Sequence, residues 1–129
     1  MSDPVAGRLR LLERALDRLD EALARPADGI VRDAAIQRFE FTFEMAWKPV
    51  RAYASSEGLD CVSPRDSFRV AFRLGLVDKD ASWMAMVEDR NRTTHTYDEA
   101  IAQRIFEALP GYARLLRRLL DALTARLTA

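Results

Sequence analysis

The feature that most constrains the fold is the spacing of apolar side chains near the N-terminus. Over residues 3–24 these side chains recur at steps of four and three, at Val5, Leu9, Leu12, Leu16, Leu19 and Leu23. The spacing places them in one stripe along a helix, and a continuous apolar stripe needs a second element to cover it. The first segment is therefore predicted to pack lengthwise against further helices.

A second long helix is predicted over residues 30–57, after a turn that contains Pro26 and Gly29. Its buried face repeats the steps of three and four, with Ala35, Phe39, Phe43, Ala46, Val50 and Tyr53. Pro49 lies inside this segment, where a proline removes one backbone hydrogen bond and clashes with the preceding turn. A kink is therefore expected near residues 45–48.

Two more helices are predicted from residues that are typical of helix ends. Ser63 and Pro64 begin the third helix, as N-cap and first helical residue, and Gly75 ends it. Its apolar side is expected to contain Phe68, Ala71, Phe72 and Leu74. Asp80 is the expected cap of the fourth helix. The apolar residues of that helix are Trp83, Met84 and Val87.

The last part of the chain contains two helical segments. Thr96 and Glu99 form a capping box, in which Thr96 caps a helix over residues 100–109. The Pro110-Gly111 pair is then expected to break or bend the chain before a final segment over residues 112–127. That segment places its leucines along one stripe, at Leu116, Leu119, Leu123 and Leu127.

No segment alternates with the two-residue period of a β-strand, so the prediction is a single all-α domain over residues 1–129. Its expected architecture is an antiparallel up-and-down bundle of four long helices plus a short helix. The sequence has no apolar run of 18 residues and no apolar signal-peptide core, so we expect a cytoplasmic protein without a membrane span. The single cysteine, Cys61, excludes an intramolecular disulfide and a cysteine-based metal cluster.

Net charge gives no indication of a nucleic-acid partner, because 20 basic residues balance 20 acidic ones. Arginines recur along the last helices, at Arg104, Arg114, Arg117, Arg118 and Arg126. Arg114, Arg117 and Arg118 share a helix face that could contact RNA phosphates or an acidic partner. A solvated helix face is the favoured interpretation.

The only histidine of the chain, His95, follows Arg90 by five residues. On an uninterrupted helix the two side chains would point about 140° apart, since each residue advances by about 100°. A turn before a helix capped by Thr96 would instead gather Arg90, Asn91 and His95 around one spot. The free N–H groups of the new helix would add positive potential there, which suits a phosphate.

These residue types suit RNA cleavage without a metal. A histidine can take the proton of a ribose 2′-hydroxyl, and an arginine stabilises the charge that develops on the attacked phosphate. The product would be a cyclic phosphate. The alternative is a structural histidine that binds a backbone carbonyl or packs across a dimer seam.

The segment from Arg90 to Tyr97 matches the pattern R-x4-H-x-Y and resembles the HepT-like branch of the HEPN (higher eukaryote and prokaryote nucleotide-binding) superfamily. The branch is also described as nucleotidyltransferase substrate-binding proteins. Residues 38–58, 63–77 and 90–100 resemble it in the same order, so the similarity covers nearly the whole chain. Pro49 departs from the pattern of the branch and bears on the local geometry beside the expected cleft.

The resemblance implies a helical homodimer in which the R-x4-H segments of two protomers line a shared cleft. It implies a metal-independent endoribonuclease toxin, without a cofactor, that acts on RNA. Its partner would be a small nucleotidyltransferase antitoxin, which neutralises the toxin by attaching AMP to the tyrosine of the motif. Arg90 and His95 would then be catalytic, Asn91 supportive and Tyr97 the modified residue.

A second group of residues lies on the second predicted helix, over residues 30–57. Glu40, Glu44 and Lys48 are spaced four apart, so they form either a solvated ladder of ion pairs or, for Glu44, a support for the cleft near Arg90. The aromatic residues among them are interpreted as core rather than as a platform for bases: Phe39, Phe43 and Trp47. One histidine and scattered carboxylates give no spacing typical of a metal site, and none is predicted.

Two other functions remain open at this point. The chain could be a non-catalytic nucleotide- or substrate-binding subunit of a two-component nucleotidyltransferase. It could also be a helical dimer whose motif only stabilises the interface. The combination of Arg90, His95 and Tyr97 favours the toxin, because a passive binding protein has little need for a titrating imidazole.

Overall fold

The computed structural model describes residues 4–128, and every regular element in that range is helical. The elements are α1 (Pro4–Leu23), α2 (Gly29–Ser56), α3 (Pro64–Arg73), α4 (Ser82–Arg92), the 3-10 turn η1 (Thr93–His95) and α5 (Glu99–Thr128). The first residue of the first predicted helix, at position 3, lies outside the described range. None of the described helices is long and apolar enough to cross a membrane.

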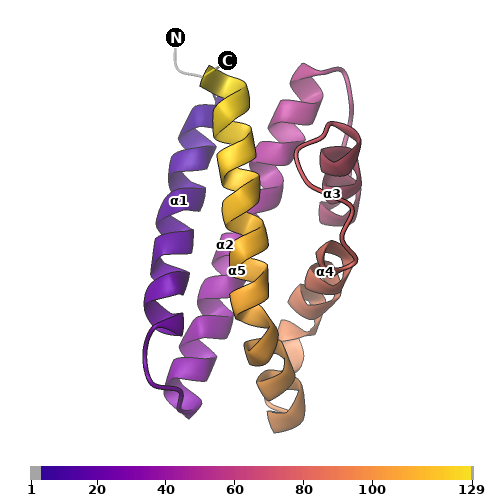
Figure 1. Ribbon diagram of the computed structural model, residues 1–129. Helices are drawn as coiled ribbons and strands as arrows, with labels where there is room; N and C mark the ends of the chain where they lie inside the picture. Colours follow the sequence, from indigo (N-terminus) through magenta and orange to yellow (C-terminus); the bar gives the residue numbers. More distant parts are fainter. Residues whose placement is uncertain (1–3, 129) are drawn as a thin grey trace.

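The helices form an antiparallel bundle with four columns (Figure 1). Three columns are the long helices α1, α2 and α5, which all pack against one another. The fourth column is shared by α3 and α4, which follow each other along the same side of the bundle (Figure 1). The predicted all-helical fold is confirmed, with two short helices taking the place of one long one.

The predicted apolar stripes form the core. The leucines of α1 at positions 9, 12, 16 and 19 are buried, as are those of α5 at 116, 119 and 123. Aromatic rings fill the centre: Phe43 meets Phe68 at a centroid distance of 5.7 Å, and Phe68 meets Trp83 at 4.8 Å. Each ring contributes about 1.5–3 kcal/mol through burial. One position was predicted wrongly, because Phe72 is 48% exposed and lies outside the packed side of α3.

The start of α3 follows the sequence signal, whereas the N-cap of α4 is Ala81 and not the predicted Asp80. The Ser63 hydroxyl accepts a hydrogen bond from the Asp66 amide at 3.1 Å, with Pro64 as the first helical residue. The Asp80 carboxylate accepts one from the Ser82 amide at 2.8 Å, and this bond lowers the pKa of Asp80 below its usual value. Both side chains satisfy amides that the first turn of a helix leaves without partners.

The two prolines inside helices do not end them. Pro49 lies in α2 and Pro110 lies in α5, which runs without a break through the Pro110-Gly111 pair. Of the two predicted outcomes the break does not occur, because the buried residues Leu109 and Tyr112 keep both sides of the pair in the core. The first turns of α5 lean away from the axis of the rest of the helix, which agrees with the predicted bend (Figure 1). The kink expected at residues 45–48 stays a prediction.

Candidate functional site

The candidate site lies where α4 ends and the chain turns into α5. The last turn of α4 tightens into η1, and two threonine hydroxyls bind backbone carbonyls of this turn. Thr93 Oγ1 donates to the Arg90 carbonyl at 2.7 Å, and Thr96 Oγ1 donates to the Thr93 carbonyl at 3.2 Å. The Asp98 amide closes the turn on the His95 carbonyl at 3.0 Å. Local bonds thus define the backbone of the motif.

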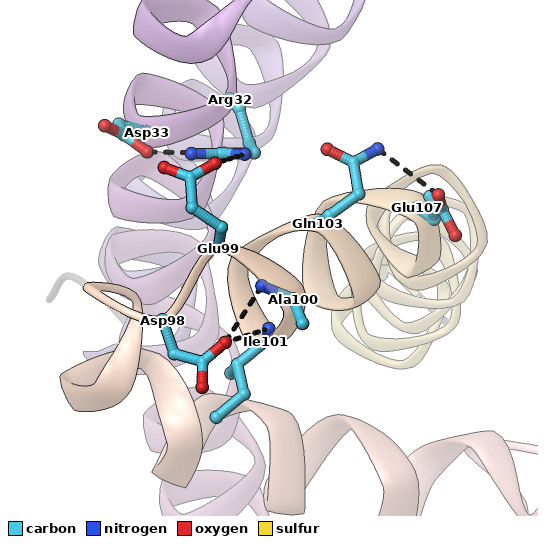
Figure 2. A network of polar contacts seen from close by, with 8 residues as sticks. All are labelled: Arg32, Asp33, Asp98, Glu99, Ala100, Ile101, Gln103 and Glu107. Atoms are coloured by element: carbon cyan, nitrogen blue, oxygen red, sulfur yellow. Dashed lines mark hydrogen bonds and ion pairs between the residues drawn. The ribbon is translucent and has the colours of Figure 1, made fainter.

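Helix α5 is capped by Asp98, which corrects the predicted capping box. The Asp98 carboxylate accepts hydrogen bonds from the amides of Ala100 at 2.9 Å and Ile101 at 3.2 Å (Figure 2). Thr96 cannot cap α5, because its hydroxyl is engaged in the preceding turn. The cap moves by two residues, so the motif contains a longer turn than the sequence suggests.

A long-range ion pair fixes this helix start to α2. Arg32 Nη1 donates to Glu99 Oε2 at 3.0 Å, and the Arg32 Nε lies 3.5 Å from Asp33 (Figure 2). The hydrogen bond from Arg32 holds the pKa of the Glu99 carboxyl below its usual value, and the same bond raises the pKa of Arg32. The start of α5 is thereby tied to the first turn of α2.

Arg90 is held against α2. Its Nη2 donates to Glu44 Oε1 at 3.2 Å, and both side chains are 31% exposed. Its guanidinium carbon lies 6.0 Å from the centre of the Phe43 ring, and its Nε is enclosed without a hydrogen-bond partner. The other carboxylate oxygen of Glu44 accepts a bond from Trp47 Nε1 at 3.1 Å. Glu44 therefore contacts Arg90 rather than Lys48, and the ladder of ion pairs does not form.

His95 and Tyr97 form a separate pair in solvent. His95 Nδ1 lies 3.3 Å from the Tyr97 hydroxyl, and the two rings meet edge to face at a centroid distance of 5.9 Å. Tyr97 is 82% exposed. Within the described range no hydrogen bond or ion pair directly joins the side chains of this pair to those of Arg90 and Glu44. Asn91 is exposed, and the gathering of Arg90, Asn91 and His95 around one phosphate stays a prediction.

The sequence interpretation missed a buried pair beneath the motif. The Tyr112 hydroxyl donates to Asp89 Oδ2 at 2.5 Å, and Arg92 Nη1 donates to Asp89 Oδ1 at 3.3 Å. Burial and the bond to Asp89 raise the pKa of Tyr112 above its usual value. The signal was present, because Asp89 lies three residues after Met86 on the apolar side of α4. A carboxylate there needs a donor.

The aromatic residues of α2 divide into two kinds. Phe39 and Phe43 are fully in the core, as predicted. Trp47 is only partly buried, and its indole contacts Glu44, which also contacts Arg90.

The arginines of α5 also differ from one another. Arg117 pairs with Asp17 and Asp20 of α1. Such internal pairing disfavours Arg117 as a phosphate contact.

Comparison with known proteins identifies the family. Residues 7–125 match the family described as "nucleotidyltransferase substrate binding protein like". The chain belongs to that family. A probable ribonuclease HepT from Haemophilus influenzae is 27% identical over 92% of each chain. The resemblance to the HepT-like branch is therefore confirmed.

Solved structures share the fold of this HepT-like chain. A Thermus thermophilus protein is 44% identical, with a TM-score of 0.81 over 87% of this chain and 98% of that one. A tri-AMPylated HEPN toxin from Shewanella oneidensis, solved in complex with an MNT antitoxin, is 18% identical. Its TM-score is 0.79 over 97% of this chain and 99% of that one. At 18% identity, the similarity to the Shewanella protein shows a shared fold and no more.

Proposed function

We propose that the chain is a metal-independent endoribonuclease toxin, which a small nucleotidyltransferase neutralises by transferring AMP to Tyr97. The observation that carries the proposal is the exposed pair of His95 and Tyr97, 3.3 Å apart, in the same segment of the chain as an arginine that Glu44 holds in place. The relative described as a probable ribonuclease and the AMPylated toxin with its nucleotidyltransferase-type partner support it.

In this proposal Arg90 binds the scissile phosphate. Its guanidinium is permanently charged and offers several donors in a fixed plane, of which Glu44 engages one. The part of the side chain that remains exposed presents donors to solvent. Charge developing on the phosphate oxygens during attack would strengthen these bonds, which lowers the barrier. Asn91, exposed beside Arg90, supplies an additional donor or acceptor for the strand.

His95 acts as the general base. Its Nδ1 donates to the Tyr97 oxygen in the productive tautomer, which leaves Nε2 without a proton. Nε2 takes the proton of the ribose 2′-hydroxyl, the 2′-oxygen attacks phosphorus, and the bond to the 5′-oxygen breaks. Water protonates the departing 5′-oxygen. The products are a 2′,3′-cyclic phosphate and a 5′-hydroxyl end, and no metal takes part.

AMP on Tyr97 would stop this reaction because its phosphodiester adds negative charge and bulk where the RNA phosphate must bind. The exposed position of Tyr97 leaves its hydroxyl accessible to a second protein.

The chain would act as a homodimer in the cytoplasm. Two R-x4-H segments would line one cleft, so that the RNA strand contacts both protomers. The surface position of His95 and Tyr97 supports this arrangement, because a second copy can approach the motif without unfolding α4 or α5.

The test is cleavage of end-labelled RNA in the presence of EDTA. The intact mass of the protein is measured first, to show that the sample carries no adenylate. We expect wild type to cut and to leave cyclic-phosphate ends, and His95→Ala and Arg90→Ala to lose at least about 100-fold in rate. Arg14→Ala, on the far column α1, is the control and should cut like wild type. Failure of unmodified wild type to cut tRNA or mRNA would contradict the proposal.

The second candidate is a non-catalytic nucleotide- or substrate-binding subunit of a two-component nucleotidyltransferase. The observation that favours it is the family description, which names substrate binding and no cleavage. The motif would then be a docking surface. Binding of a nucleotidyltransferase without RNA cleavage by either protein would select this candidate.

A further inference from the structure

Arg51 of α2 has an arrangement that differs from that of the other arginines near the site. Its guanidinium carbon lies 4.8 Å from the centre of the Trp47 ring, within the range of a cation–π contact. Arg51 is exposed, and no carboxylate lies within ion-pair distance of it in residues 4–128. Its charge and its in-plane donors are therefore unengaged by protein.

The Trp47 ring that supports Arg51 is itself fixed. Trp47 Nε1 donates to Glu44 Oε2 at 3.1 Å, while Glu44 Oε1 accepts from Arg90 at 3.2 Å. Glu44, Trp47 and Arg51 are spaced by three and four residues, which places them on one face of α2. A continuous line of contacts thus runs from Arg51 through Trp47 and Glu44 to Arg90.

We propose that Arg51, oriented by Trp47, binds a second phosphate of the RNA strand beside the one held by Arg90. This inference rests on the proposed function and adds a binding subsite to it. A guanidinium stacked on an aromatic face keeps its donors directed outward in one plane, which matches phosphate oxygens. Restricting the long side chain beforehand also lowers the entropy cost of binding. The contact is to the backbone, so it selects no particular base.

The proposal predicts a loss of RNA affinity that does not depend on the base sequence of the RNA. Loss of the Arg51 charge should weaken affinity for single-stranded RNA by about tenfold, the typical loss for one charge-assisted bond. The slope of log affinity against log salt should become shallower by about 0.7, the value for one phosphate contact on a single strand. In cleavage, Arg51→Gln should raise KM and leave kcat unchanged, because the contact is the same in ground and transition states.

The experiment measures binding of a fluorescein-labelled oligouridylate to the full chain in the His95→Ala background, over a series of salt concentrations. Arg51→Gln is compared with Arg14→Gln, which removes the same charge from an exposed position on α1. Arg51→Lys is the conservative variant, and it should recover the salt slope without the full affinity, since it keeps the charge and loses the flat fork. Circular dichroism confirms that all variants remain helical.

The outcomes separate this inference from the proposed function. A larger loss and a shallower slope for Arg51→Gln than for Arg14→Gln support the subsite, even if wild type fails to cleave RNA. Equal affinities and slopes for these two variants overturn the subsite, even if wild type cleaves. A lower kcat at unchanged KM in Arg51→Gln also contradicts it, because that result indicates a role in the chemical step.

Discussion

Arg90 and His95 are five residues apart in the chain, yet their side chains lie in different surroundings. Arg90 belongs to a regular helix, packs over Phe43 and is bound by Glu44. His95 ends a 3-10 turn and contacts Tyr97 at the surface. Electrostatic stabilisation requires a group that is fixed before the reaction. Proton transfer and covalent modification require access. The motif provides one fixed end and one accessible end.

The largest expected difference between the two ends concerns packing. Phe43→Ala should lower the free energy of unfolding by about 3–5 kcal/mol, because it removes a fully buried ring beneath Arg90. His95→Ala should change it by less than about 0.5 kcal/mol, as expected of an exposed side chain. Urea denaturation of both variants measures the difference. Equal losses would show that the histidine end is also part of the packed fold.

The next largest effect on stability is expected at the buried pair of Tyr112 and Asp89. Tyr112→Phe removes the hydroxyl that donates to Asp89, and it should cost about 1–3 kcal/mol because a buried carboxylate loses a partner. Thermal unfolding of the variant checks this, with Tyr97→Phe as the matched exposed control. A loss as small as that of Tyr97→Phe would mean that Arg92 alone satisfies Asp89.

The same hydroxyl predicts a dependence on alkaline pH. Burial and the Asp89 bond raise the pKa of Tyr112 in the folded chain above its value of 10.0 in the unfolded chain. Its contribution to stability is therefore present below pH 10.0 and is lost progressively as pH rises from 10.0 through the higher folded-state pKa. Between about pH 9 and pH 11 wild type should lose on the order of 1 kcal/mol more stability than Tyr112→Phe, because that range covers only about the first pH unit of the loss.

Glu44→Gln tests how strictly the fixed end must be held. The amide keeps the shape of the carboxylate but loses its charge, so the partly exposed pair with Arg90 should lose about 1 kcal/mol of stability. If Arg90 binds the scissile phosphate as proposed, cleavage should fall by about tenfold to 100-fold, because a displaced guanidinium would no longer meet the phosphate. Glu40→Gln, on the same helix and outside these contacts, serves as control. Unchanged cleavage would show that Arg90 is positioned without Glu44.

The smallest effect concerns the start of α5, next to the accessible end. The Arg32 bond lowers the pKa of Glu99 in the folded chain, so its contribution is present above the unfolded value of 4.5 and is lost as pH falls through the folded value. Arg32→Gln should lower the melting temperature slightly at neutral pH and not at all in strong acid. A difference that persists in strong acid would require another role for Arg32.

The sequence signals succeeded where the deciding interactions are local. The cap of α3 was predicted because Ser63, Pro64 and Asp66 act within one turn. The cap of α5 was not, because Thr96 and Asp98 are both good capping residues two positions apart. The choice between them follows from the turn bond of Thr96 and from Glu99, which binds an arginine 67 residues away.

The candidate site was predicted in part for the same reason. The R-x4-H-x-Y pattern identified Arg90, His95 and Tyr97 as one segment, and the structure pairs the last two. The contact between Arg90 and Glu44 spans 46 residues, and helix periodicity alone left Glu44 between two interpretations. At Pro110 local propensity left a break and a bend both open, and burial on both sides of the proline keeps α5 intact.

The most direct test of the proposed function is to mix the unmodified chain with a nucleotidyltransferase of the antitoxin type and ATP, and to follow peptide mass and RNA cleavage together. We predict that wild type gains AMP on the peptide that contains Tyr97 and loses cleavage in proportion. Tyr97→Phe should keep cleaving and gain no AMP. Neutralisation of Tyr97→Phe by the same treatment, with AMP on another residue, would contradict the claim that one exposed pair carries both the activity and its control.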